Sequence, residues 1–118
     1  MSPRERAAAR IVELLDSPLL RALAEPARLE VLRVLLVHGS SDIATIAEHL
    51  PQDRSVISRH LKTLEDAGIL RHQREGRRVI YGIDGSFVIA LERIVSEAKS
   101  LAPACCPAVA PVPRDSRR

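Results

Sequence analysis

The sequence is constrained most strongly by two short helical patterns that a three-residue turn separates. The first pattern repeats apolar residues on one helical face, namely Ile43, Ile46, Ala47 and Leu50. Pro51 ends this pattern, and a second one begins after Asp53 and stops at Gly68. Its inward positions are Ile57, Leu61 and Leu64. Two short helices joined by so tight a turn predict a helix-turn-helix, a motif whose second helix enters the major groove of DNA.

Beyond Gly68 the apolar pattern changes from helical to alternating, which is typical of β-strands. Residues 69–74 predict one strand, and Val79, Tyr81 and Ile83 lie on one face of a second strand. Gly76 lies at the tip of the turn between them. A hairpin in this position is a wing, so the sequence predicts a mainly α fold with one small β-hairpin, a winged helix-turn-helix.

Further helices are predicted on both sides of this motif. They cover residues 4–15, a short segment from Pro18, and a segment from Pro26 to Gly39. The core stripe of the third of these helices is predicted to be Leu29, Leu32, Leu35 and Leu36. The last helix, roughly residues 86–101, carries a coiled-coil-like apolar seam, which typically packs against another helix.

The chain is predicted to divide near residue 101. Residues 1–101 are expected to form a winged helix-turn-helix DNA-binding domain, to which the family resemblance described below adds dimerisation. The prolines from Pro103 onward are expected to prevent further helix, so residues 102–118 are predicted to be a flexible, proline-rich tail that carries Cys105 and Cys106.

The positive charge of the chain is concentrated on the second helix and the hairpin. Residues 54–78 contain seven Lys or Arg and three acidic residues, a net charge of +4, whereas the whole chain carries +3. Charge concentrated in this way is typical of a phosphate-binding face. A solvated helix and hairpin that are rich in arginine would look the same by charge alone.

Composition argues against several other classes of protein. The aromatic residues are limited to Tyr81 and Phe87, too few to stack the bases of single-stranded nucleic acid. The chain has no apolar run of about 18 residues and no apolar core near its start, so we expect no membrane span and a cytoplasmic location. It has no set of catalytic residues at usable spacing, so we expect no enzyme activity.

Four runs of the sequence together resemble the ArsR/SmtB family of small winged-helix metal and redox sensors. They are RALAEPARLEVLRVLL, SDIATIAEHL, DRSVISRHLKTLEDAGIL and REGRRVIYGI, within residues 21–101. The resemblance implies a homodimer held by the first and last helices. It also implies repression of an operon at a palindromic operator in double-stranded DNA and release when an inducer binds.

The resemblance implies DNA-contacting residues on the second helix and the wing. The exposed start of this recognition helix would read the major groove, with the candidates Arg54, Ser55, Ser58 and Arg59. Lys62 is expected to touch phosphate, and Arg77 and Arg78 at the wing tip are expected to meet the backbone or the minor groove. Among these, Ser58 and Arg59 are the preferred candidates for reading sequence.

The metal sites usual in the family are largely missing from this chain. Where a Cys-x-Cys site would lie in the helix-turn-helix, the chain has Asp42, Ile43 and Ala44. At the positions of the family's zinc site it has Asp84, Ser86, Glu97 and Ser100, which include no imidazole and do not favour tetrahedral zinc.

Cys105 and Cys106 are therefore the candidate inducer site. Two adjacent thiolates can bind one soft ion, which suits trivalent arsenic, antimony or a trivalent organoarsenical, with no obligatory cofactor. Three alternatives stay open: redox or persulfide sensing by the same thiols, cysteines with no role, and a winged-helix module that binds protein partners.

Overall fold

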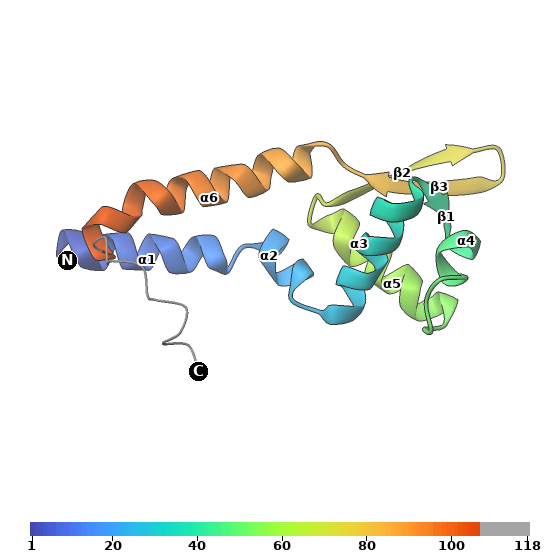
Figure 1. The fold of residues 1–118 in the computed structure, drawn as a ribbon, viewed down its shortest axis with the longest axis horizontal. Coiled ribbons are helices and arrows are strands. Elements are labelled where there is room, and N and C mark those ends of the chain that lie inside the picture. The colour runs from blue at the N-terminus through green and yellow to red at the C-terminus, as the bar shows by residue number, and fades with distance from the viewer. Residues whose placement is uncertain (107–118) are drawn as a thin grey trace, which may run out of the picture.

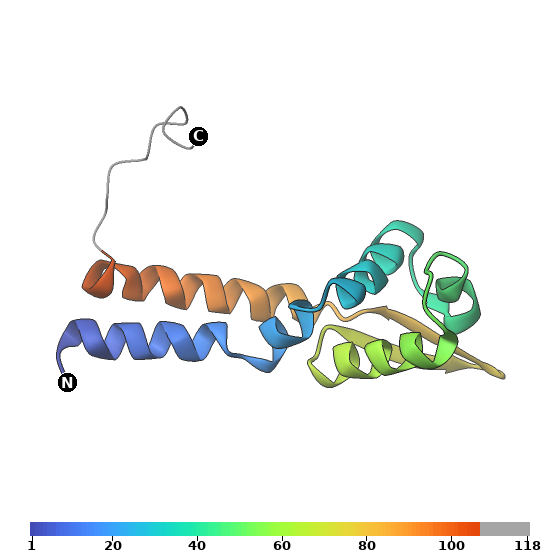
Figure 2. The same cartoon turned by 90° about the horizontal axis from the view of Figure 1, so that it is seen from below.

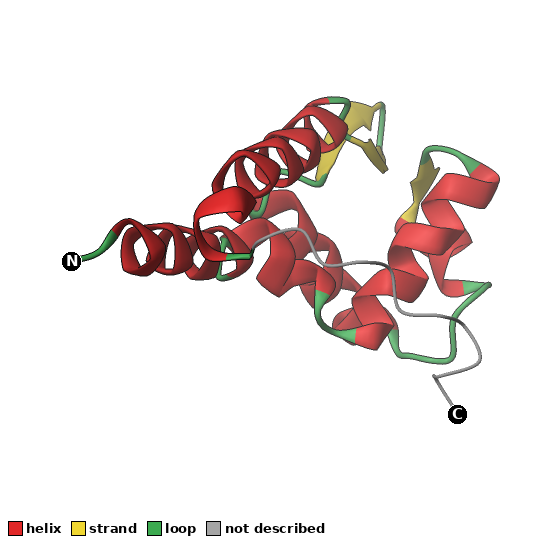
Figure 3. Ribbon diagram, turned by 60° about the vertical axis from the view of Figure 1, so that its left-hand side comes forward, coloured by secondary structure: helices red, strands yellow, loops and turns green. Residues whose placement is uncertain are grey.

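The computed structural model describes residues 1–106, which form six helices and three short strands (Figure 1). The helices are α1 (Pro3–Leu15), α2 (Pro18–Leu23), α3 (Pro26–His38), α4 (Ile43–Ala47), α5 (Arg54–Asp66) and α6 (Ser86–Cys105). The strands are β1 (Ser41–Asp42), β2 (Leu70–Glu75) and β3 (Arg78–Ile83). The strands gather in one part of a largely helical molecule (Figure 3). The predicted winged helix-turn-helix is confirmed.

Short polar residues fix where the first helices begin. Ser2 caps α1 through the amide of Glu5, and the Glu5 carboxylate accepts from the Ser2 amide in return. Ser17 caps α2 through the amide of Leu20, and Asp42 caps α4 through the amide of Thr45. A proline follows the cap of α1, α2 and α3, where its missing N–H costs no helical hydrogen bond.

The hydrophobic core lies where α3, α5 and the start of β2 meet. Its most completely buried side chains are Val31, Val34, Ile46, Ile57, Leu61, Leu64, Ile69 and Leu70. The predicted α3 stripe is correct for Leu32 and Leu35 but wrong for Leu29 and Leu36, whose side chains are exposed. Apolar residues surround most of α3, so periodicity alone did not identify the face that turns inward.

The wing belongs to a three-stranded antiparallel sheet with the order β1-β3-β2. The hairpin pairs Leu70 with Ile83 at its base and Glu75 with Arg78 at its tip. The sequence did not predict β1, because two residues are too short to show alternation. β1 pairs Ser41 with Tyr81, and this pairing joins the helix-turn-helix to the wing.

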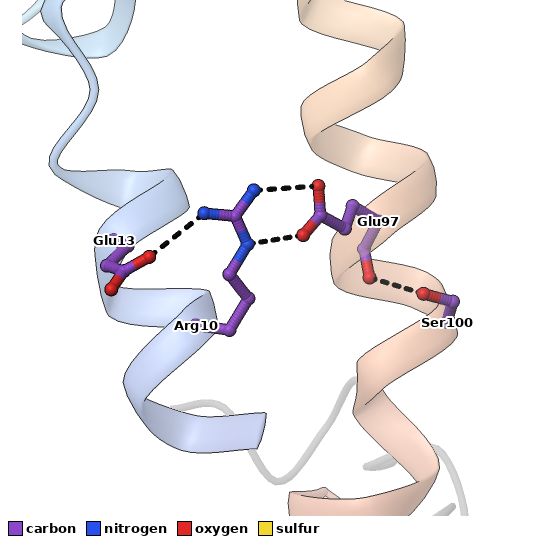
Figure 4. A network of polar contacts seen from close by, with 4 residues as sticks. All are labelled: Arg10, Glu13, Glu97 and Ser100. Carbon is purple, nitrogen blue, oxygen red and sulfur yellow. Dashed lines mark hydrogen bonds and ion pairs between the residues drawn. The ribbon is translucent and has the colours of Figure 1, made fainter. Parts of the chain in front are cut away.

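Helices α1 and α6 lie side by side and form an arm that extends away from the core (Figures 1 and 2). An ion pair links them, in which the Arg10 guanidinium binds both carboxylate oxygens of Glu97 and also Glu13 (Figure 4). Within the part of the chain that the structure describes, no helix has both the length and the apolar character to cross a membrane.

Helix α6 continues past its predicted end at residue 101 and includes Pro103. The prediction of the helix end is wrong because Pro103 lies in the final turn, where its missing N–H removes one hydrogen bond only. Ala102 and Ala104 beside it favour helix, and the Cys106 amide donates to the carbonyl of Ala102. Cys105 is therefore helical, while residues 107–118 of the predicted tail lie outside the described residues.

Helix α5 ends in a glycine turn that leads directly into β2. Gly68 has φ +81, its amide donates to Glu65, and the Ile69 amide donates to Leu64. These two hydrogen bonds form a Schellman motif, which needs a left-handed residue after the helix. No atom lies within 4 Å of a Cβ added at Gly68, so a substitution there meets backbone strain without a steric clash.

We expect Gly68→Ala to lower the free energy of unfolding by about 1 kcal/mol, because alanine is strained in the left-handed region. Gly85→Ala is the matched control, since Gly85 has φ −58 and is equally open. The control should be neutral or slightly stabilising. Urea denaturation of both variants measures the difference, and equal effects would contradict the role given to Gly68.

Candidate nucleic-acid interface

The polar face of α5 is the largest part of the candidate interface. Ile57, Leu61 and Leu64 have no exposed surface and fix the inward face of this helix. All five sequence-predicted residues of α5 are exposed, namely Arg54, Ser55, Ser58, Arg59 and Lys62. Four of them, from Ser55 to Lys62, recur at helical spacing and form one stripe that faces solvent.

The side chains of this stripe differ in whether they already make contacts within the protein. The Lys62 Nζ lies 3.6 Å from the Asp66 Oδ2 one turn along the helix. Over residues 1–106, Arg59 makes no side-chain hydrogen bond or ion pair, so its five N–H donors are available to a ligand. His60, beside the buried Leu61, is half-buried.

The two predicted arginines of the wing lie in different environments. Arg77 follows Gly76, whose φ is +63, and its exposed side chain has no partner among the described residues. The Nε of Arg78 donates to the Asp42 Oδ2 at 3.0 Å. The sequence pattern gave no sign of this contact, which joins residues 36 positions apart.

Asp42 connects α4 with the wing. Its Oδ1 accepts from the Thr45 amide at 2.9 Å, while its Oδ2 accepts from Arg78. The hydrogen bonds from Thr45, followed by that from Arg78, lower the pKa of the Asp42 carboxyl to about 2. The carboxylate therefore stays ionised throughout the physiological pH range.

A groove of about 360 Å³ joins α5 to the wing. Its lining includes Ser58 from α5, Arg77 and Arg78 from the wing, and Asp42 from the start of α4. The fold therefore brings Ser58 of α5 and the two arginines of the wing to one surface.

The thiol pair lies at the other end of the molecule. Cys105 is the last residue of α6 and Cys106 follows it, at the end of the arm away from the wing (Figure 1). Their Sγ atoms are 3.1 Å apart, with Cys105 half-buried and Cys106 exposed. The hydrogen bond with Cys106 and partial burial hold the pKa of the Cys105 thiol above its usual value.

The other positions considered for metal have structural roles here. Asp84 accepts from the Ser86 amide at the start of α6, and Glu97 is paired with Arg10. The Ser100 hydroxyl donates to the carbonyl of Glu97 (Figure 4). Across residues 1–106, no three side chains of the metal-binding types are grouped to hold an ion.

Known proteins resemble this chain across the helix-turn-helix and beyond it. The family of bacterial regulatory proteins called arsR matches residues 25–72. A helix-turn-helix transcriptional regulator of Methanocaldococcus jannaschii is 32% identical over 77 residues, which are 65% of this chain and 86% of that protein. The chain belongs to the ArsR family. This family consists of transcriptional regulators, which confirms the prediction that the protein is not an enzyme.

Two further relatives of this ArsR-family chain bear on its function. A probable mercury resistance operon repressor of Streptomyces lividans is 32% identical over 89 residues, covering 73% of this chain and 70% of the relative. A homodimeric winged helix-turn-helix DNA-binding domain from Mycobacterium bovis superposes with a TM-score of 0.55 and 29% identity. That similarity covers 85% of this chain and 88% of the other.

We expect Arg78→Gln to raise the Asp42 pKa from about 2 toward its ordinary 3.8 without reaching it, because the Thr45 hydrogen bonds remain. Carbon-13 NMR of the carboxyl groups measures this shift. A depressed folded-state pKa stabilises the fold above about pH 4, and this contribution is lost as the pH falls from about 4 to 2.

The Asp84 carboxyl serves as the control for this titration. Its pKa is lowered by its hydrogen bonds with Ser86, which Arg78→Gln leaves in place. An unchanged Asp42 titration in the variant would show that the Asp42–Arg78 ion pair does not form in solution.

Proposed function

We propose that this ArsR-family regulator is a repressor that binds a palindromic operator as a homodimer and is released by a thiophilic inducer at Cys105 and Cys106. The observation that carries the proposal is the common surface formed by the polar face of α5 and the wing. The thiol pair lies far from that surface, so an inducer there would act through the fold without blocking the DNA site.

The side chains of α5 have the chemistry that base recognition requires. A guanidinium such as that of Arg59 can donate two hydrogen bonds to O6 and N7 of guanine, which discriminates by about 1 to 3 kcal/mol. Ser55 and Ser58 are short and can donate to a base or a phosphate. Arg54 and Lys62 supply charge at the edges of the stripe, and Arg77 supplies it at the wing.

A second copy of the chain is the proposed partner of the α1–α6 arm. Five large apolar side chains of the arm are each more than half exposed, namely Val12, Leu15, Val88, Ile89 and Val95. An apolar groove of about 430 Å³ runs along α6 and is also lined by Leu15 of α1 and Leu20 of α2. A symmetric dimer would cover such a surface, and the Mycobacterium bovis relative is a homodimer.

Dimerisation through the arm would also set the spacing of the two α5 helices. Successive major grooves on one side of DNA are about 34 to 36 Å apart, so a dimer reads both only at the matching separation. An inducer that favours another arrangement by roughly 1 to 3 kcal/mol releases DNA about 5- to 150-fold.

The proposed inducer is a soft ion or compound that accepts two sulfurs. Cys105 and Cys106 already turn their sulfur atoms toward each other, and thiolates select thiophilic metals. Trivalent arsenic, antimony and trivalent organoarsenicals are the inducers considered. The Streptomyces relative is named for mercury resistance, which supports the thiophilic class.

Oxidation or persulfidation of the same cysteines is the second candidate. Both thiols are free in the structure, and Cys106 is exposed to small oxidants. A disulfide between neighbouring residues is strained and therefore easily reduced, which suits a reversible redox signal.

Two duplexes are compared, one enriched from a random pool by the parent protein and one with a scrambled sequence. We expect Arg59→Ala to reduce the difference in binding free energy between them by roughly 1 to 3 kcal/mol. Lys62→Ala should weaken binding to both duplexes equally and reduce the slope of log K against log salt by about 0.9. Fluorescence anisotropy over a potassium chloride series measures both effects.

The matched control for these variants is Arg6→Ala, which removes the same charge from the far end of α1 (Figure 1). It should leave affinity, discrimination and the salt slope unchanged. Failure to enrich any duplex, or binding that does not weaken with salt, would favour the protein-interaction module over a DNA-binding repressor.

We expect phenylarsine oxide to release the parent protein from the enriched duplex and to leave the doubly substituted Cys105→Ser/Cys106→Ser protein bound. Serine keeps the size of the side chain but removes the thiolate that binds soft ions. Arsenite, mercuric chloride and hydrogen peroxide are tested in parallel by anisotropy. Release by peroxide alone would favour the redox alternative, and a double variant that dissociates like the parent would contradict a role for the thiols.

A further inference from the structure

The Asp42–Arg78 ion pair connects the start of α4 with the tip of the wing, beyond the part of the wing that the core holds. Asp42 ends β1 and caps α4, the first helix of the helix-turn-helix. Arg78 begins β3, at the wing tip. The backbone pairing between β1 and β3 is limited to two residue pairs, Ser41 with Tyr81 and Asp42 with Ile80.

We propose that the Asp42–Arg78 ion pair sets the wing against the helix-turn-helix, so that Arg78 is a positioning residue while Arg77 is the wing arginine that contacts DNA. The readout in DNA binding rests on the proposed function. The positioning role itself rests on the fold and can be tested without DNA.

Register places this ion pair where it extends the short β1–β3 ladder. Ile80 lies opposite Asp42, and Arg78 is two residues further along β3 toward the tip. Residues two apart in a strand lie on the same face of the sheet, so Asp42 and Arg78 form a diagonal cross-strand pair. The ion pair therefore holds the end of β3 near the wing tip, beyond the residues that pair with β1.

Asp42 is held in place before it meets Arg78. The Thr45 amide donates to its Oδ1, and only 20% of the side chain is exposed, compared with 60% for Arg78. A fixed carboxylate makes an ion pair more effective than two mobile side chains would, because less side-chain freedom is lost.

Charge argues that Arg78 contributes little to phosphate binding. The Arg78 guanidinium donates at 3.0 Å to a carboxylate that is only 20% exposed, so it adds no net positive charge to the groove, and Asp42 would repel a phosphate that approached it. The Lys62–Asp66 pair differs, because both side chains are exposed and 3.6 Å apart, which leaves Lys62 able to turn to phosphate. Arg77 has no such acidic partner among the residues that the structure describes. The two neighbouring arginines therefore divide the roles of contact and positioning.

The opposite interpretation makes a different prediction for one variant. If Arg78 leaves Asp42 to bind phosphate, Asp42→Asn frees the arginine, removes a negative charge and tightens DNA binding. If the ion pair positions the wing, the same variant weakens binding. Asparagine is as good a helix cap as aspartate, so α4 keeps its start in this variant.

The experiment measures the affinity of four variants for the duplex enriched by the parent protein. They are Asp42→Asn, Arg78→Gln, the double variant that combines these two, and Arg77→Gln. We expect Asp42→Asn and Arg78→Gln each to weaken binding roughly 2- to 5-fold with an unchanged salt slope, as the loss of one ion pair allows. The double variant should be no weaker than either single variant. Arg77→Gln should lower the salt slope by about 0.9, the value of one phosphate contact.

Amide hydrogen exchange of the DNA-free protein tests the same ion pair independently. Exchange at Val79 and Ile80 should be faster in Asp42→Asn and Arg78→Gln than in the parent, while the buried amides of α3 and α5 keep their protection. Arg77→Gln should leave the wing unchanged. These core amides also show whether each variant is folded.

Tighter DNA binding by Asp42→Asn would overturn the proposal, and so would wing exchange that equals the parent's in both ion-pair variants. A salt slope that falls in Arg78→Gln as much as in Arg77→Gln would assign Arg78 to phosphate instead. If no duplex is enriched, the proposed function fails, and the exchange measurement still decides the positioning role.

Discussion

Burial of one apolar stripe on α5 determines the orientation of the side chains that are proposed to touch DNA. Ile57, Leu61 and Leu64 have no exposed surface, and each lies in the core with residues of α3 and β2. Because the helix cannot rotate without exposing them, Ser58 and Arg59 must face solvent. Full burial of each such side chain contributes about 1.5 to 3 kcal/mol, more than any single surface ion pair here.

The same core also positions the wing. The α5 helix ends at Asp66, Gly68 turns the chain, and the buried Ile69 and Leu70 lead straight into β2. The core residue Ile69 lies in the turn between helix and strand, and a second core residue, Leu70, begins β2, so the turn has little conformational freedom. The wing therefore leaves the core in a fixed direction at its base, and the Asp42–Arg78 ion pair acts nearer its tip.

Strong local patterns in the sequence predicted α5 and the β2–β3 hairpin correctly, whereas contacts between distant residues escaped prediction. The α5 helix alternates apolar and polar positions clearly, and Gly68 and Gly76 both adopt the positive φ that their turns require. The two-residue strand β1 and the partner of Arg78 have no local signal, since both depend on residues far along the chain. The predicted inward face of α3 was partly wrong because α3 is apolar on most sides. The predicted end of α6 was wrong because the helix accommodates a proline in its final turn. The roles assigned to α5, the wing and the thiols stay predictions.

The connection between α6 and the sheet explains how an event at the thiols could reach the DNA-reading surface. Helix α6 runs from Cys105 back to Ser86, and only Asp84 and Gly85 separate it from β3. The Asp84 amide donates to the carbonyl of Ile69, so this junction is tied to the core beside α5. Arg10 and Glu97 join α1 to α6, so the arm would tilt as a unit (Figure 4). A tilt of the arm would act on β3 through α6 and on the core through α1 and α2, and β3 meets the helix-turn-helix through β1 and through Asp42. The short path through β3, and not proximity of the thiols to DNA, is what makes a sensor at the far end of the arm physically workable.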